Sequence, residues 1–197
     1  MRASTRFPSG TQLHNYWQGL GAHAHTYEDQ GATRTGLPPQ GYDYDINRIC
    51  LGQGQQVYEA AVISLRDWRM FPPSWTVVFP DKVPLIEGKD VVVLFRLFGM
   101  WWFNGCRIVY PIHEKNRFGF AYGTLEGHVE RGEEQFLVYR DDQDQVWYQI
   151  TAFSKPGVWL TKLGYPVARR LQRRFVQQSM QCMQQSTKLT ADAFRTV

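Results

Sequence analysis

The most constraining feature of this chain is a series of strand-like segments joined by very short connections. Each segment is rich in β-branched and aromatic residues, and turn residues separate most of them. Parallel neighbours would need crossovers of about a dozen residues or more. The short connections therefore predict antiparallel pairing. The expected strands cover residues 75–79, 91–98, 101–113, 118–125, 133–139 and 146–153.

One strand boundary has two interpretations. Asn104-Gly105 is a common hairpin turn, and such a turn would divide the segment 101–113 into two strands. The same pair also suits a β-bulge within a single long strand. The sequence is compatible with both arrangements, so the number of strands stays open at this point.

A strand, a helix and a second, longer helix complete the expected elements. Residues 44–51 form a strand pattern, and residues 55–69 carry apolar side chains at helical spacing. The longer helical pattern runs from about Leu160 to about Ser186. Pro166 lies near its start, either in the first turn or at a kink.

This order of elements predicts an α+β fold. A curled antiparallel sheet of about six or seven strands, with an early helix, packs against a long C-terminal helix, as in the helix-grip folds. We expect one domain over residues 42–187. Residues 1–41 lack a sustained period and predict an extended or partly ordered arm, and residues 188–197 predict a flexible tail.

The C-terminal helix has two different faces at about 100° per residue. One face is largely apolar, and it contains Gln172, whose buried amide needs a partner in the protein, in water or in a cavity ligand. The opposite face is basic and is either solvated or in contact with an anionic partner. The basic residues are Arg169, Arg170, Arg173 and Arg174. The apolar face comprises Val167, Ala168, Leu171, Phe175, Ser179, Cys182 and Met183.

The strand over residues 118–125 has one unusually bare face. Phe118, Phe120, Tyr122 and Thr124 share one side, whereas Gly119, Ala121, Gly123 and Leu125 share the other. Glycine weakens a strand, so its repeated use indicates that a helix or a ligand approaches this face closely.

The loop after this strand carries the candidate catalytic residues. His128, Glu130, Glu133 and Glu134 lie within a few positions of one another, and such a group can transfer protons or can be a solvated hairpin tip. Glu133 and Glu134 alternate in direction, so one of them can point inward. An inward carboxylate needs a partner, for which Arg107 and Tyr148 are the candidates.

The sequence predicts no metal site, no cofactor and no membrane-spanning segment. Cys50, Cys106 and Cys182 are widely spaced without a CxxC pair, which disfavours a disulfide framework and structural zinc and indicates a reducing compartment. No secretory leader pattern is present at the N-terminus, so we expect a cytoplasmic protein. The net charge of +4 permits an acidic partner, although nucleic acid is not favoured.

Three segments carry a family resemblance: GTLEGHVERGEEQF (123–136), VWYQITAFSKP (146–156) and LGYPVARRLQRRF (163–175). With further matches that include Tyr27, Gly31 and Thr33, the chain from about Tyr27 to about Met183 resembles domain-of-unknown-function family nineteen-ninety, a group of bacterial and plant proteins. The resemblance implies a START-like helix-grip fold, whose members mostly bind or transfer apolar small molecules. It supplies no catalytic residues.

The chain departs from the expected family pattern at three positions. Gly105, Glu126 and Val129 stand where prolines are expected. Two of these positions flank the Gly127-His128 pair, so the loop that carries His128 is expected to be less rigid here.

Three functions follow, in order of preference. The first is binding of an apolar or lipid-like small molecule between sheet and helix, with polar contacts from Tyr122, Thr124, Arg107, Tyr148 and Gln172. The second is an enzyme that uses the His128 and glutamate group. The third is an interaction protein that presents Arg169, Arg170, Arg173 and Arg174 to an anionic partner. We lean away from an enzyme, and the oligomeric state is open.

Overall fold

The computed structural model describes residues 2–37, 39–157 and 165–194 of the chain. Within this part the strands are β1 (Arg2–Ser4), β2 (Asp43–Gln53), β3 (Thr76–Phe79), β4 (Asp90–Leu97), β5 (Met100–Glu114), β6 (Arg117–Thr124), β7 (Glu130–Arg140) and β8 (Gln145–Pro156). The helices are α1 (Gly10–Gly19), the short 3-10 helix η1 (Leu20–Ala22), α2 (Ala32–Thr35), α3 (Gln55–Arg66) and α5 (Tyr165–Phe194).

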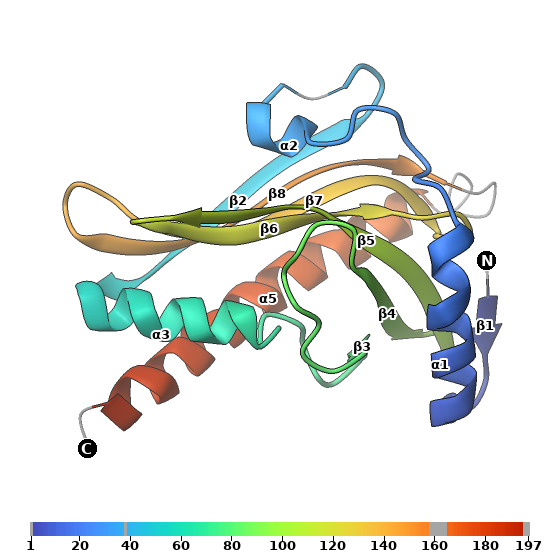
Figure 1. Ribbon diagram of the computed structural model, residues 1–197, viewed down its shortest axis with the longest axis horizontal. Coiled ribbons are helices and arrows are strands. Elements are labelled where there is room, and N and C mark those ends of the chain that lie inside the picture. Colours follow the sequence, from blue (N-terminus) through green and yellow to red (C-terminus); the bar gives the residue numbers. More distant parts are fainter. Residues whose placement is uncertain (1, 38, 158–164, 195–197) are drawn as a thin grey trace.

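The described strands form one sheet, in which every pairing is antiparallel. The strand order is β2-β8-β7-β6-β5-β4-β3, and β1 adds to β5 beside this path. The sheet curls around α5, which crosses one face together with α3, whereas α2 lies on the other face (Figure 1). The predicted α+β helix-grip architecture is therefore confirmed.

Asn104-Gly105 lies inside an unbroken β5. Asn104 pairs with Val93 and Gly105 pairs with Val92, so the hairpin interpretation is wrong. The only shift in register between β5 and β6 falls between Ile108 and Tyr110, so the bulge lies further along the strand. A side chain at position 105 would overlap Leu20, and this close packing explains the glycine better than a turn does.

The long C-terminal helix extends further than its sequence pattern indicated. Helix α5 continues to Phe194, so the predicted flexible tail is helical over residues 188–194. Thr187 and Ala191 are buried, and α5 packs along α3. This packing stabilises turns whose own sequence has weak amphipathic character. Pro166 lies in the first turn of the described helix, whereas the expected residues 160–164 lie outside the described part.

The N-terminal segment is ordered over most of its length, which the sequence did not predict. Ser9 and Gln12 form a capping box at the start of α1. Leu13 and Leu20 are buried in a cluster with Val92, Leu94, Phe103 and Leu125 on the sheet face opposite α5. The elements of this segment are short and are held by these long-range contacts, so a search for extended periodicity misses them.

The main core lies on the concave side of the sheet. Residues from β4 to β8 that point to this side pack against α3 and α5, and the cluster includes Phe120, Phe136 and Tyr148. The cysteines at positions 50, 106 and 182 are all free thiols. Across the described residues, no helix combines the length and the apolar character that a membrane crossing requires.

Candidate functional site

A cavity of about 1000 Å³ lies between the concave face of the sheet and α5. Its wall is largely apolar because alternate residues of each strand point to the same side of the sheet. Val93, Phe95 and Leu97 come from β4, Ile150 comes from β8, and Phe175 comes from α5. A cavity of this size can enclose a small organic molecule.

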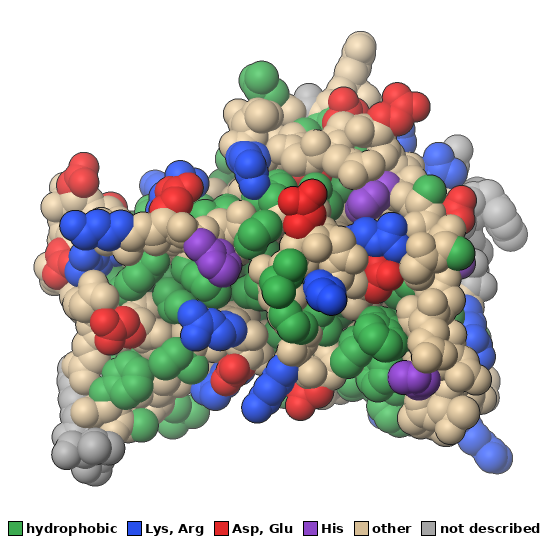
Figure 2. Space-filling view, in the orientation of Figure 1, with side chains coloured by type: hydrophobic (Ala, Val, Ile, Leu, Met, Phe, Trp, Pro, Cys, Tyr) green, Lys and Arg blue, Asp and Glu red, His purple; other side chains and the backbone are tan. Residues whose placement is uncertain are grey.

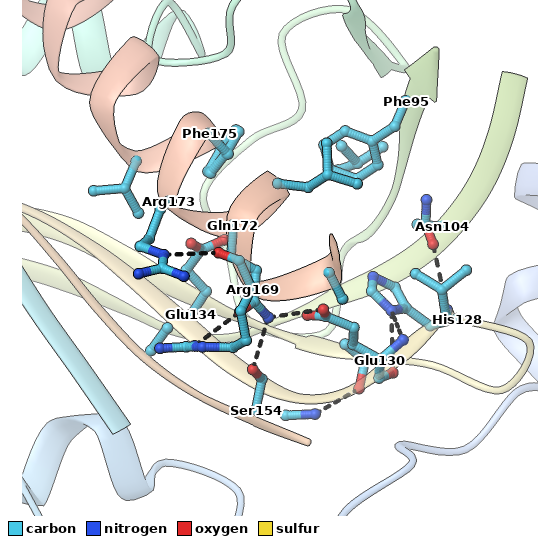
Figure 3. Close-up of a pocket in the computed structure, with 18 of the residues that line it drawn as sticks. Phe95, Asn104, His128, Glu130, Glu134, Ser154, Arg169, Gln172, Arg173 and Phe175 are labelled. Carbon is cyan, nitrogen blue, oxygen red and sulfur yellow. Dashed lines mark hydrogen bonds between the residues drawn. The ribbon is translucent and has the colours of Figure 1, made fainter. Parts of the chain in front are cut away.

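One side of the cavity is polar and collects nine of the residues predicted from sequence. They come from β6, from the loop before β7, from β7 itself and from α5, and Figure 3 shows several of them together with Asn104. The predicted residues that border this wall are Tyr122, Thr124, His128, Glu130, Glu133, Glu134, Arg169, Gln172 and Arg173. Segments far apart in the sequence thus meet at one site.

Glu134 is the inward carboxylate, and its partner is Tyr122. The Tyr122 hydroxyl donates to Glu134 Oε2 at 2.8 Å, and the two residues face each other across the β6–β7 ladder. Burial raises the pKa of Glu134 to about 7, and the nearby Glu130 adds to this rise. Neither Arg107 nor Tyr148, the predicted partners, hydrogen-bonds to this carboxylate.

His128 is held as a neutral imidazole. His128 Nδ1 lies 2.9 Å from the backbone nitrogen of Glu130 and 3.1 Å from the Glu130 carbonyl oxygen, so the Glu130 backbone fixes the ring. Burial lowers the pKa of His128 to about 4. The ring is therefore uncharged near neutral pH, and it is a weak base for proton transfer.

Gln172 and Glu130 belong to a network that runs to the surface. Gln172 Nε2 donates to Glu130 Oε1 at 2.7 Å and to Ser154 Oγ at 3.0 Å, while Gln172 Oε1 accepts from Arg169 at 2.8 Å (Figure 3). Arg169 donates to both carboxylate oxygens of Asp45. The side-chain amide of Gln172, on the apolar face of α5, is thus fully hydrogen-bonded to protein groups, although Gln172 also lines the cavity.

Glu133 faces away from this network. Its carboxylate accepts from the Tyr27 hydroxyl at 2.8 Å, from the Gly31 N–H at 2.7 Å, and from both the N–H and the hydroxyl of Thr33. Four donors saturate the carboxylate, so Glu133 anchors the N-terminal segment and is not available for catalysis. The sequence carried one signal for these partners, since Tyr27, Gly31 and Thr33 are among the family matches.

The bare face of β6 packs against the N-terminal segment. A side chain on Gly123 would overlap the ring and hydroxyl of Tyr27, and one on Gly119 would overlap the backbone of Phe136 and Leu137. The close approach inferred from the glycines is therefore real. The approaching groups are Tyr27 and the neighbouring strand, and the C-terminal helix lies against the opposite, aromatic face.

Arg107 and Tyr148, which the sequence predicted as ligand contacts, bond to other parts of the protein instead. Arg107 pairs with Asp90 at 2.6 Å and donates to the carbonyls of Leu20 and His23, so it ties down the N-terminal segment and does not line the cavity. The Tyr148 hydroxyl bonds Ser179 of α5 at 2.9 Å, outside the cavity wall.

Thr124 lines the cavity, but its hydroxyl already forms hydrogen bonds within the protein. It bonds Thr26 and accepts from the Gly132 N–H. Thr124 therefore links the start of β7 to the N-terminal segment, to which the Glu133 carboxylate also bonds.

The four predicted surface arginines have different environments. Arg169 is paired with Asp45 at 2.7 Å, and the Arg174 guanidinium lies 5.2 Å from the ring centre of Trp75. Arg173 is exposed and also lines the cavity, and Arg170 is exposed. On the face shown in Figure 2, basic and acidic side chains are interspersed rather than gathered into one patch.

Within residues 2–37, 39–157 and 165–194, no three His, Cys, Asp or Glu side chains come together in a way that could hold a metal ion. His14 contacts the Trp17 ring, His23 bonds the Glu126 carbonyl, and His25 contacts the Tyr27 ring. These three histidines of the N-terminal segment thus contact different parts of the chain.

The curled sheet, the long helix and the cavity between them define a helix-grip domain with a largely apolar site. The family model described as "Domain of unknown function (DUF1990)" matches residues 26–182, and the chain belongs to this family.

Two relatives and one solved structure illustrate the similarity. A UPF0548 protein of Dictyostelium discoideum is 36% identical over 147 residues, which cover 68% of each chain. A UPF0548 protein of Deinococcus radiodurans is 35% identical over 163 residues, covering 77% of this chain and 81% of the relative. The crystal structure of hypothetical protein jhp0584 from Helicobacter pylori aligns with a TM-score of 0.58 and 14% identity, covers 83% of this chain and 96% of its own, and shares the fold.

Proposed function

We propose that this protein binds an apolar or aromatic, lipid-like small molecule in the cavity between its sheet and α5. The observation that carries the proposal is the cavity of about 1000 Å³, whose wall is mostly apolar and whose polar groups lie on one side. Transfer of apolar ligand surface from water into such a cavity is favourable by roughly 25 cal/mol per Å². The polar side would orient the ligand.

The experiment compares a blocked cavity with a matched control. Ala152 of β8 lies directly opposite Glu134 and lines the cavity, so Ala152→Phe fills the space beside the polar groups. Gln149→Phe places the same side chain on β8 but on the other face of the sheet. Both variants are compared with the unmodified protein by the fluorescence of the neutral probe N-phenyl-1-naphthylamine and by native mass spectrometry of freshly purified protein.

The proposal predicts probe binding by the unmodified protein and by Gln149→Phe, with binding weakened about tenfold or more in Ala152→Phe, since one or two kcal/mol of lost contact has this effect. A co-purified small molecule, if detected, should be absent from Ala152→Phe alone. Failure of the unmodified protein to bind the probe, or equal binding by the two Phe variants, would contradict a ligand in this cavity.

A second candidate function, proton transfer, has one observation in its favour. Glu134 is a carboxyl group with a pKa near neutrality that faces an enclosed, mostly apolar space beside Tyr122. Of the four candidates from the sequence, Glu133 is saturated and His128 is a weak base. This leaves Glu134 as the stronger candidate, and a catalytic protein should lose turnover of its substrate in Glu134→Gln while keeping its affinity.

A further inference from the structure

The polar side of the cavity is acidic, and of the two described guanidinium groups that border it, one is paired with a carboxylate and the other is exposed to solvent. Glu130 and Glu134 both line it. The half-buried guanidinium of Arg169 donates two hydrogen bonds to Asp45 and a third to Gln172. Arg173 also lines the cavity, but its side chain is exposed at the surface. An anionic group placed beside Glu134 would therefore face two carboxyl groups, with the nearer guanidinium already paired and Arg173 at the exposed rim.

Glu134 has hydrogen-bonding capacity that no described residue uses. Tyr122 donates to its Oε2, and no group of the described chain donates to its Oε1. A carboxylate can accept about four hydrogen bonds. Because Glu134 lines the cavity, its remaining acceptor sites can bond to an occupant of the cavity.

We propose, on the basis of the small-molecule binding proposed above, that the occupant carries its polar group as a hydrogen-bond donor, an amine or a hydroxyl, and that Glu134 accepts from it. The apolar body of the occupant then lies along Phe95, Phe175 and the neighbouring apolar wall. A fatty acid in the same orientation would place its carboxylate beside Glu134, which low polarity makes costly.

The ionisation of Glu134 is compatible with both donor groups. Burial raises its pKa to about 7, so ionised and neutral forms coexist near neutral pH. An ammonium group stabilises the ionised form, and a hydroxyl can donate to either form. His128 is neutral near pH 7, so it adds no charge to this side of the cavity.

The test uses three probes with the same twelve-carbon chain: dodecylamine, 1-dodecanol and dodecanoate. Each displaces N-phenyl-1-naphthylamine from the protein at concentrations below micelle formation. Dodecylamine and 1-dodecanol should displace the dye more strongly than dodecanoate. In Glu134→Gln, the affinity for dodecylamine should fall by about ten- to a hundredfold, which is the effect of one charge-assisted hydrogen bond. The affinity for 1-dodecanol should change less, because the amide oxygen of glutamine still accepts a hydrogen bond.

Glu114→Gln is the matched control, since Glu114 is an exposed carboxylate at the end of β5. It should leave all three affinities unchanged. Tightest binding of dodecanoate, with loss of that binding in Arg173→Gln, would overturn the donor inference and leave the binding function intact. Dodecylamine affinity that is equal in Glu134→Gln and the unmodified protein would overturn it as well. No binding of the dye or of any probe would overturn the binding function itself.

Discussion

Glu133 and Glu134 are neighbours in the sequence, but they lie in opposite kinds of environment. Glu133 points to the convex side of the sheet, where four donors from the N-terminal segment saturate it. Glu134 points to the concave side and lines a cavity, and Tyr122 is its one donor among the described residues. The strand places them on opposite faces because side chains alternate along β7.

The contrast separates a structural carboxylate from a functional one. A buried charge that is fully hydrogen-bonded stabilises the fold, because its removal leaves several donors without a partner. A buried carboxyl group with unused acceptor sites contributes less to stability and is available to a ligand. The following changes test this difference between the two faces.

The largest effect is expected from Glu133→Ala. Tyr27, Gly31 and Thr33 would lose their common acceptor, and the free energy of unfolding should fall by about 3 kcal/mol. Glu134→Ala should lower it by about 1 kcal/mol or less, because only the Tyr122 hydroxyl loses a partner. Urea unfolding measures both values. Equal losses in the two variants would contradict the assignment of separate roles.

Gly123→Ala tests the close packing on the convex side. The added methyl group would overlap Tyr27, and such overpacking should cost about 2 kcal/mol. Gly21→Ala is the control, since nothing lies near the position of its added methyl group. Thermal unfolding of the two variants provides the comparison. A Gly123→Ala protein as stable as the control would show that Tyr27 can move away freely.

The pH dependence of stability tests the concave side. Burial raises the pKa of Glu134 from its ordinary 4.5 to about 7, so the folded state binds the extra proton and stability from this group falls as pH rises through that interval. Burial lowers the pKa of His128 from 6.5 to about 4, so its contribution rises with pH over that interval. The two slopes oppose each other where the intervals overlap.

Single variants separate the two slopes. Relative to the unmodified protein, Glu134→Gln should gain stability as pH rises from 4.5 to 7, and His128→Gln should lose stability as pH rises from 4 to 6.5. Urea unfolding at several pH values gives these difference curves. Flat curves for both variants would contradict the buried environment of the two groups.

The smallest effect on stability is expected from changes to the arginines on the surface of α5. Here too, a charge that is paired lies beside charges that are not. Arg169 is paired with Asp45, whereas Arg170, Arg173 and Arg174 are exposed and have no acidic partner among the described residues. Replacing these three arginines by glutamine should change the free energy of unfolding by about 0.5 kcal/mol or less.

The same triple variant tests the arginine face as a binding surface. If this face contacts an anionic partner, the unmodified protein should be retained on vesicles that contain phosphatidylserine at low salt, and the variant should lose that retention. Arg117→Gln, a change at an exposed arginine distant in sequence, serves as the control. Equal retention of variant and control would contradict a role for the arginine face.

Local patterns in the sequence were sufficient for most of the architecture. Short connections predicted the antiparallel sheet, the apolar arc predicted which face of α5 packs inward, and alternation predicted that one of the two adjacent glutamates would point inward. The N-terminal segment escaped prediction because its short elements depend on Leu13, Leu20 and Tyr27 reaching distant strands. Partners more than about a hundred residues apart, such as Tyr27 and Glu133, leave no local period.

The sequence by itself therefore determined the fold class, the polarity of the strand and helix faces, and a short set of site candidates, because these depend on the spacing of side chains along the backbone. Only the tertiary structure decided which candidates share the cavity. It joined Tyr122 to Glu134 across two strands, committed Arg107 and Tyr148 to other partners, and turned Glu133 toward the N-terminal segment. These outcomes depend on which surfaces meet when the sheet curls around α5, and that geometry is a property of the whole chain.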